Sequence, residues 1–324
     1  MNGKQLKRPK TLAIAAAALA AGAALNIASA RRAERGRPAR GRFIDVGDTR
    51  LHYTDEGEGP PVVLLHGNGV TAEDWRSSGV IDALAGSHRV IAFDRPGFGY
   101  SSRPRSRVWT AAAQATLLHQ ALHDLDVEPA VIVGHSWGTL VALALALEYP
   151  HDCKRLLLIS GYYFPTVRAD VAIFGVPALP LVGDLLRYTI LPPLGYLLAP
   201  LLSAQLFAPA AVDGAFAADL PMSMRPWQIR ANAEDTALMV PSAAAMEHRY
   251  KDLRVPVAIV AGEGDKIVNP AQSSRLADEI HESRLLVISG VGHMVHYTAK
   301  DTIAQTISTL ANAEAPHEYD HVLG

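Results

Sequence analysis

The pattern Gly-x-Ser-x-Gly at residues 134–138 constrains the fold of this chain most, because it directly follows the apolar run at 130–133. A strand that turns at once into a helix brings backbone atoms close together, and residues without side chains tolerate that approach best. The next stretch, 139–148, is rich in Ala and Leu, which are good helix formers. The sequence therefore predicts a strand, a sharp turn and a helix, with Ser136 exposed at the carboxyl edge of a sheet.

A serine hydroxyl needs a base and a carboxylate before it can act as a nucleophile at neutral pH. The apolar run 257–261 predicts a buried strand, and the loop Gly-Glu-Gly-Asp-Lys that follows it carries Asp265. A further predicted strand, 284–289, is followed by Gly-Val-Gly-His, which places His293 just past the strand end. Ser136, Asp265 and His293 therefore each follow a strand, where open α/β sheets place their active sites.

Two of these assignments have competitors in the sequence. His296 lies three residues beyond His293 and is the weaker candidate for the base. Glu263 competes with Asp265, but the shorter side chain after the second glycine favours Asp265 as the group that orients the histidine. His135 lies inside the sharp turn, and we expect it to point away from the nucleophile and to have a structural role.

The oxyanion that forms during acyl transfer needs hydrogen-bond donors that are in place beforehand. The predicted strand 62–65 is followed by His-Gly-Asn-Gly at 66–69, a flexible loop at the same edge of the sheet. The backbone N–H groups of Asn68 and Trp137 are the expected pair of donors. We expect His66 to brace this loop rather than to take part in the chemistry.

In order and spacing, these motifs resemble those of the α/β-hydrolase superfamily, over residues 41–313. The turn Asp-Arg-Pro-Gly-Phe-Gly-Tyr-Ser at 94–101 belongs to the same pattern and is expected to shape a loop near the pocket mouth. The resemblance implies an eight-stranded, mostly parallel sheet flanked by helices, with a helical cap inserted before the loop that carries Asp265. It also implies an acyl-enzyme mechanism on Ser136 that needs no metal or organic cofactor.

One branch of the superfamily is disfavoured by the nucleophile itself. Asn68 and Trp137 resemble the halide-binding pair of haloalkane dehalogenases, but those enzymes and the epoxide hydrolases use aspartate where this chain has Ser136. A serine that attacked an alkyl halide would form an ether, which water does not hydrolyse, so dehalogenation is not expected.

Residues 11–30 form an uncharged run of about 20 residues, close to the length that crosses a bilayer as a helix. Ala-Ser-Ala at 28–30 is typical of a signal-peptidase site, whereas the arginines directly after it are typical of a stop-transfer flank. The length of the run favours a retained membrane anchor over export after signal cleavage, and a soluble Ala-rich helix is a third possibility. We assign residues 1–42 to this segment and a basic linker.

The formal charge of −2 is unevenly distributed along the 324 residues. Residues 1–42 carry a charge of +9, which leaves −11 for the rest of the chain. Binding of nucleic acid by the folded domain is therefore not expected. Cys153 is the only cysteine, which excludes an internal disulfide.

Nearly a hundred residues separate the predicted strand 155–160 from the next one, far more than a crossover needs. We assign residues 162–250 to a helical cap. The assignments that remain are the core at 43–161 and 251–314 and the tail at 315–324.

The first half of the cap is unusually apolar. Asp184 and Arg187 are the only charged residues between 171 and 209, and prolines at 177, 180, 192, 193 and 200 predict short helices. This segment either packs on the catalytic edge or forms an apolar lid that is open to lipid. Tyr162, Tyr163 and Trp227 are candidates for lining the pocket, although such residues more often serve packing.

The sequence thus predicts a membrane-anchored serine hydrolase whose small hydrophobic substrate is an apolar ester. The alternative within enzymes is a carbon–carbon bond, epoxide or cofactor-free haloperoxidase or perhydrolase reaction on the same fold. The alternative from another class is a hydrolase-like protein that binds a hydrophobic ligand without turnover, but the complete set of Ser136, Asp265 and His293 argues against it.

Overall fold

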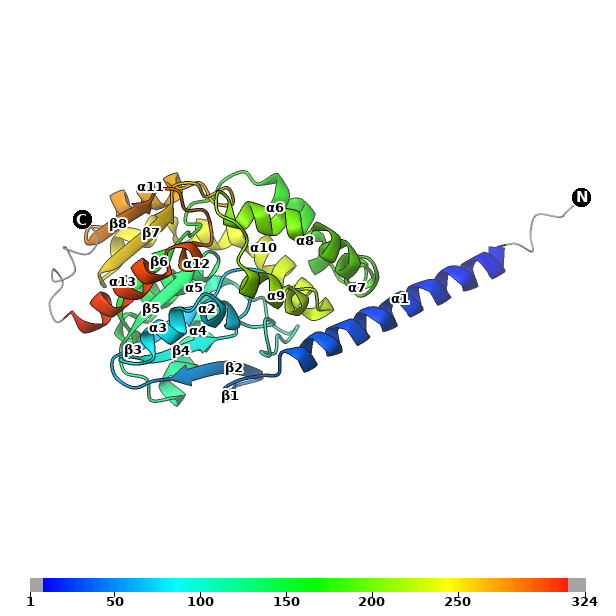
Figure 1. The fold of residues 1–324 in the computed structure, drawn as a ribbon, viewed down its shortest axis with the longest axis horizontal. Coiled ribbons are helices and arrows are strands. Elements are labelled where there is room, and N and C mark those ends of the chain that lie inside the picture. The colour runs from blue at the N-terminus through cyan, green and yellow to red at the C-terminus, as the bar shows by residue number, and fades with distance from the viewer. Residues whose placement is uncertain (1–7, 314–324) are drawn as a thin grey trace, which may run out of the picture.

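The computed structural model describes residues 8–313, and an eight-stranded sheet forms the centre of that region (Figure 1). The strands are β1 (Arg42–Val46), β2 (Thr49–Glu56), β3 (Pro61–Leu65), β4 (Arg89–Phe93), β5 (Ala130–His135), β6 (Cys153–Ile159), β7 (Val257–Gly262) and β8 (Ser283–Ile288). Their order across the sheet is β1-β2-β4-β3-β5-β6-β7-β8, and only the pairs β1·β2 and β2·β4 are antiparallel. The predicted fold is confirmed, while the assigned tail at 315–324 lies outside the described residues.

The central strands read as continuous apolar runs because helices cover both faces of the sheet. In β3, Val63 and Leu65 enter one core cluster, and Val62 and Leu64 enter the other. The first cluster lies under α4 (Ala111–Asp124), α5 (Gly138–Glu148) and α11 (Ala271–Glu279). The second lies under α2 (Glu73–Ser77), α3 (Val80–Leu84), α12 (Val295–Thr298) and α13 (Lys300–Asn312).

The strand register brings the predicted site loops together. Leu65 in β3 pairs with Gly134 in β5, so these parallel strands end at the same level. Gly262 in β7 pairs with Ile288 in β8, which aligns the ends of the two strands that precede Asp265 and His293. All four site loops therefore leave the same carboxyl edge of the sheet.

The segment between β6 and β7 folds into helices that cover this edge (Figure 1). They are α6 (Ala169–Phe174), η2 (Val176–Ala178), α7 (Val182–Thr189), α8 (Leu191–Phe207), α9 (Gly214–Ser223), α10 (Pro226–Met246) and η3 (Glu247–Asp252). The expectation that the prolines break this stretch into short helices was wrong for α8, which has 17 residues. Pro192 and Pro193 lie in its first turn, where a missing N–H breaks no helical bond, and the helix continues through Pro200.

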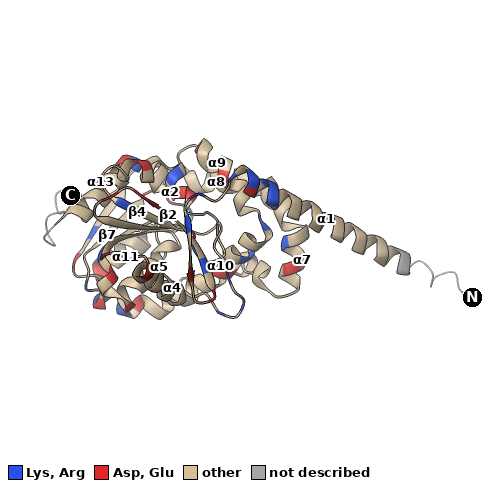
Figure 2. Ribbon diagram, turned by 90° about the horizontal axis from the view of Figure 1, so that it is seen from below, with Lys and Arg blue, Asp and Glu red and all other residues tan. Residues whose placement is uncertain are grey.

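The N-terminal helix predicted from the sequence is present as α1 (Arg8–Gly36). It projects from the body (Figures 1 and 2), and the side chains of residues 11–20 are exposed throughout. Its second half packs against α7, α9 and α10. The stretch Thr11–Gly36 is long and apolar enough to cross a membrane.

Candidate active site

Ser136 occupies a strained turn between β5 and α5. Its φ of 51° lies in the left-handed region that residues with a side chain rarely adopt. The flanking glycines permit this geometry, because a Cβ on Gly138 would lie 2.4 Å from the carbonyl oxygen of Leu65 and one on Gly134 would lie 2.7 Å from that of Gly138. The backbone thus holds Ser136 at the carboxyl edge of the sheet.

Asp265 and His293 form a buried hydrogen-bonded pair. The Nδ1 atom of His293 lies 2.8 Å from Oδ2 of Asp265. The other carboxylate oxygen, Oδ1, accepts the backbone N–H groups of Ile267 at 2.8 Å and Val268 at 2.9 Å. Both oxygens are therefore held in place, and a histidine that donates from Nδ1 presents Nε2 as a proton acceptor. Glu263, the competing acid, is exposed.

The structure brings His293 next to the turn that carries Ser136. His135, the residue before the serine, donates from Nε2 to the backbone carbonyl of His293 at 3.1 Å, and the two rings lie 5.0 Å apart. The backbone N–H of His293 donates to the carbonyl of Leu206 in α8 at 3.1 Å. The loop with His293 is thus fixed from below by β5 and from the cap side by α8.

Asn68 and Trp137 line the same cavity as Ser136. Within the described part of the chain, neither of their backbone N–H groups donates to a protein acceptor. Their side-chain N–H groups are used instead: the amide N–H of Asn68 donates to the carbonyl of Asn232 and to Thr236, and the indole of Trp137 donates to the carbonyl of Asp235 at 2.8 Å. The two backbone N–H groups can therefore donate to an oxyanion, whereas the side-chain N–H groups already donate to cap helix α10.

A residue that no sequence pattern singled out, Arg95, supports the loop before Asn68. The buried guanidinium of Arg95 donates to the backbone carbonyls of His66 at 2.8 Å and Gly67 at 3.0 Å, and it pairs with Asp235 at 2.5 Å. His66 accepts the backbone N–H of Arg95 at 3.0 Å, in line with its expected bracing role. Burial, with the nearby charge of Arg95, lowers the pKa of His66 to about 3. The signal in the sequence was an arginine two residues after the end of a buried strand.

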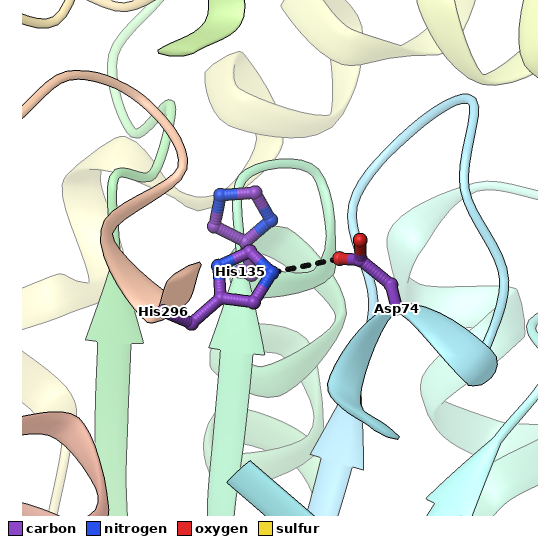
Figure 3. A group of neighbouring side chains, drawn as sticks. All are labelled: Asp74, His135 and His296. Carbon is purple, nitrogen blue, oxygen red and sulfur yellow. Dashed lines mark hydrogen bonds and ion pairs between the residues drawn. The ribbon is translucent and has the colours of Figure 1, made fainter. Parts of the chain in front are cut away.

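A second histidine–aspartate pair lies behind the turn (Figure 3). The Nε2 atom of His296 is 2.8 Å from Oδ2 of Asp74, and the rings of His135 and His296 lie 4.3 Å apart. Potential ligand atoms of these three residues lie within 4.8 Å of one another, a spacing that a metal ion could bridge, but Asp74 and His296 already bind each other. Tyr297 donates to the other oxygen of Asp74 at 2.9 Å. His296 therefore pairs with Asp74 and not with Asp265, and its ring packs against His135 in the turn.

A cavity of about 260 Å³ opens beside Ser136. Besides Ser136, Trp137 and Tyr162, the lining contains apolar side chains, polar side chains and one charged side chain. The apolar ones are Phe174, Leu202, Leu206, Met239, Ile267 and Val268. The polar ones are Asn68, Gln205, Asn232 and Thr236, and the charged one is Arg168. Of the aromatic candidates, Tyr162 lines the cavity, whereas Tyr163 is buried and accepts a hydrogen bond from Tyr250 on its backbone carbonyl. Trp227 is not part of the lining. Arg168, which no sequence pattern singled out, directly precedes cap helix α6.

Comparison with known proteins gives consistent matches over most of the chain. The profile of the alpha/beta hydrolase fold matches residues 60–300. The chain is 28% identical to 2-hydroxy-6-oxo-2,4-heptadienoate hydrolase of Pseudomonas putida, over 85% of this chain and 97% of the relative. It is 30% identical to 2-hydroxymuconate semialdehyde hydrolase of a Pseudomonas species, over 86% and 96%. The enol-lactonase from Burkholderia xenovorans has a similar structure, with a TM-score of 0.71, 19% identity and coverage of 84% and 100%.

Proposed function

Since this chain belongs to the alpha/beta hydrolase family, we propose that it hydrolyses a carbon–carbon bond next to a carbonyl group in a largely apolar keto acid. The observation that carries the proposal is the buried Asp265–His293 pair beside the strained Ser136, at the edge of a cavity with one cationic side chain. The two similar Pseudomonas enzymes, which match nearly end to end, are named as hydrolases of dienoate and semialdehyde compounds, and this supports the carbon–carbon reaction over the expected ester cleavage.

In the proposed reaction, Oγ of Ser136 attacks the ketone carbonyl and passes its proton to Nε2 of His293. Asp265 orients the imidazole and stabilises its cationic form. The amides of Asn68 and Trp137 bind the oxyanion. The carbon–carbon bond then breaks, its electron pair passes to the conjugated acid, and His293 returns the proton to that carbon. Water hydrolyses the acyl group from Ser136, so one water is consumed per turnover and no cofactor takes part.

Arg168 gives the substrate an orientation. It is the only charged side chain among the described residues that line the cavity. A guanidinium binds a carboxylate through paired, charge-assisted hydrogen bonds, so Arg168 would hold the acid end of the substrate. The apolar side chains of the lining, such as Phe174 and Leu206, would hold the acyl end.

An uncharged ester is the second candidate substrate. It was the main expectation from the sequence, and the mostly apolar lining favours it, because an ester without a carboxylate needs no cation. The same acyl-enzyme chemistry would cleave it. Binding of a hydrophobic ligand without turnover is disfavoured, because it would not require the Asp265–His293 pair.

The two substrates can be separated with the purified full chain. We expect turnover of 2-hydroxy-6-oxo-hepta-2,4-dienoate, followed by the loss of its absorbance, and abolition of turnover in Ser136→Ala. Arg168→Met should raise KM for the dienoate and leave KM for an uncharged nitrophenyl ester unchanged. Turnover retained in Ser136→Ala would refute the mechanism. Cleavage of the ester alone, with no effect of Arg168→Met, would establish the second candidate.

We also propose that α1 anchors the protein in a membrane. Leu12 and Ile14 are largely exposed on a helix whose residues 11–20 carry no charge, and water solvates such a surface poorly. Retention of the protein in membranes after alkaline carbonate extraction, with residues 11–30 still present in the mature chain by mass spectrometry, is the expected result. A soluble exported form that begins after Ala30 would support signal cleavage instead.

A further inference from the structure

The cap carries a concentrated apolar surface. Of the 21 large hydrophobic side chains that are exposed in the described part of the chain, 13 lie between residues 173 and 202, and we call these 13 the cap patch. Leu181 is 82% exposed and Leu197 is 75% exposed. The only charged residues of this stretch, Asp184 and Arg187, bind each other, and Arg187 is buried. Soluble proteins rarely leave many large apolar side chains facing water in one segment, and such surfaces commonly contact a partner or a membrane.

The cap patch lies beside α1. The side-chain amide of Asn26 donates to the carbonyl oxygens of Tyr188 and Thr189, at the end of α7, at 2.9 Å each. The body-facing side of α1 is partly buried here, while Leu25, on the opposite side, is 71% exposed. One side of α1 thus packs on the cap, and the other remains available to lipid.

The depth of α7 follows from the geometry of α1. Residues 11–30 are about 30 Å long as a helix, the thickness of the hydrocarbon core of a bilayer. Asn26 lies about 7 Å along the axis from Arg31, where the exposed Arg31, Arg32 and Arg35 begin a basic collar (Figure 2). If the basic collar lies among the lipid headgroups, Asn26 and the end of α7 that it binds lie on the hydrocarbon side of the headgroups.

The cavity beside Ser136 reaches the cap patch. Phe174 and Leu202 are members of the patch, and both also line the cavity. The route from the patch to Ser136 is therefore bordered by apolar side chains. An apolar acyl chain that lies in the lipid could follow this route without passing through water.

From these relationships we propose that the cap patch is embedded in one leaflet of the bilayer beside α1, and that hydrophobic substrate reaches Ser136 from the lipid between Phe174 and Leu202. This inference rests on the anchoring role proposed for α1. A bilayer suits the patch better than a second copy of the chain, because the patch is continuous with a helix of membrane-spanning length and ends near a basic collar.

The test uses variants of the full chain, each with one introduced cysteine, reconstituted in vesicles of phosphatidylcholine and phosphatidylglycerol. The native Cys153 is buried, and burial raises the pKa of its thiol, so it competes little for a thiol-reactive fluorophore. The variants are Leu197→Cys in the cap patch, Ile14→Cys in α1, and Val287→Cys as an exposed control on β8, at the far end of the sheet from α7 (Figure 1). Lipids with a nitroxide on the acyl chain quench fluorophores that lie in the hydrocarbon.

We expect quenching at positions 197 and 14 and none at 287. If 14 is quenched while 197 behaves like 287, the embedded cap is refuted and the anchor stands. If neither is quenched, the anchor proposal and this inference both fall. Quenching at 197 alone would refute the anchor, and with it the placement of the patch beside a membrane-spanning α1. A blue shift at 197 that depends on protein concentration and not on the quencher would show that a second copy covers the patch, which overturns the inference.

A kinetic readout tests the entry route. Leu181→Glu and Leu197→Glu, neither of which lines the cavity, place a charge where lipid is expected. We expect the apparent KM for a long-chain substrate dissolved in the vesicles to rise about tenfold. The kcat/KM for a short, water-soluble homologue should not change. Val287→Glu is the matched control. Equal effects on both substrates, or no effect on either, would contradict entry from the lipid.

Discussion

The carboxylate of Asp235 in cap helix α10 lies 2.5 Å from the guanidinium of Arg95 in the core, and both side chains are completely buried. Its other oxygen lies 2.9 Å from the guanidinium of Arg103. Because Arg95 also binds the backbone carbonyls of His66 and Gly67, a single carboxylate connects the cap to the loop that precedes Asn68. The position of Asn68, a proposed oxyanion donor, therefore depends on the packing of cap helix α10 against the core.

Asp235→Asn should weaken the fold strongly. It would leave the buried guanidinium of Arg95 without its countercharge, whereas Arg103 keeps its ion pair with Glu234. Breaking one side of a buried pair costs about 3–5 kcal/mol of unfolding free energy. Urea unfolding of both proteins measures the difference. Asp301→Asn, at a highly exposed ion pair, is the control and should change little. Equal stability of Asp235→Asn and the native protein would show that the network is not needed.

Asp265→Asn should lower kcat by about 10⁴-fold and leave the fold intact, as in serine hydrolases that lose the acid of the triad. An asparagine oxygen can still accept the N–H groups of Ile267 and Val268, but its amide cannot stabilise the imidazolium of His293. Glu263→Gln, two residues away and exposed, is the matched control and should retain full activity. The opposite ranking of the two variants would assign the acid to Glu263.

Acid should destabilise the protein through its buried neutral histidines. Burial, with the neighbouring His296 and His293, lowers the pKa of His135 well below its ordinary value, and the pKa of His66 falls to about 3. The unfolded chain takes up a proton at each near pH 6.5 while the folded chain does not, so stability falls as pH drops below 6.5. The slope is about 1.4 kcal/mol per pH unit for each histidine.

The histidine contribution can be isolated by urea unfolding between pH 5 and 7. His135→Asn keeps a donor for the carbonyl of His293 and removes one titrating group, so the pH slope should fall by the equivalent of one proton. His248→Asn, at an exposed histidine, should leave the slope unchanged. An unchanged slope in His135→Asn would mean that this histidine titrates in the folded protein.

The buried strands of the sheet could be predicted from the sequence, because each one is a local run of apolar residues. The apolar runs before Ser136 and Asp265 are β5 and β7 in the structure. A strand covered on both faces is apolar at every position, so it is easy to recognise in the sequence. The structure also brings Asp265 and His293 into hydrogen-bond contact, although their catalytic roles remain predictions.

Contacts between distant segments could not be inferred in this way. Arg95 and Asp235 are 140 residues apart, and Asp74 and His296 are 222 residues apart. Nothing in either local sequence distinguishes a buried partner from a solvated charge. The placement of Arg168 in the cavity likewise depends on how the cap folds back over the sheet, which no periodicity specifies.

Gly138→Ala should impair both folding and the reactivity of Ser136. Its Cβ would lie 2.4 Å from the carbonyl oxygen of Leu65 and 2.7 Å from that of His66, and both are backbone atoms that cannot rotate away. Relief of this overlap must move α5 away from β3, at a cost of about 1–3 kcal/mol in unfolding free energy. The same shift would carry the amide of Trp137 away from the proposed oxyanion position.

Urea unfolding and the rate of labelling by a fluorophosphonate probe measure these two effects. Gly214→Ala is the control, because no atom lies within 4 Å of the added methyl group and alanine is the better helix former at the start of α9. Gly214→Ala should match or slightly exceed native stability, while Gly138→Ala should be destabilised and labelled at least about tenfold more slowly, since loss of one oxyanion donor costs 10²–10³ in rate. Native labelling in a destabilised Gly138→Ala protein would separate the turn geometry from the oxyanion site and count against Trp137 as a donor.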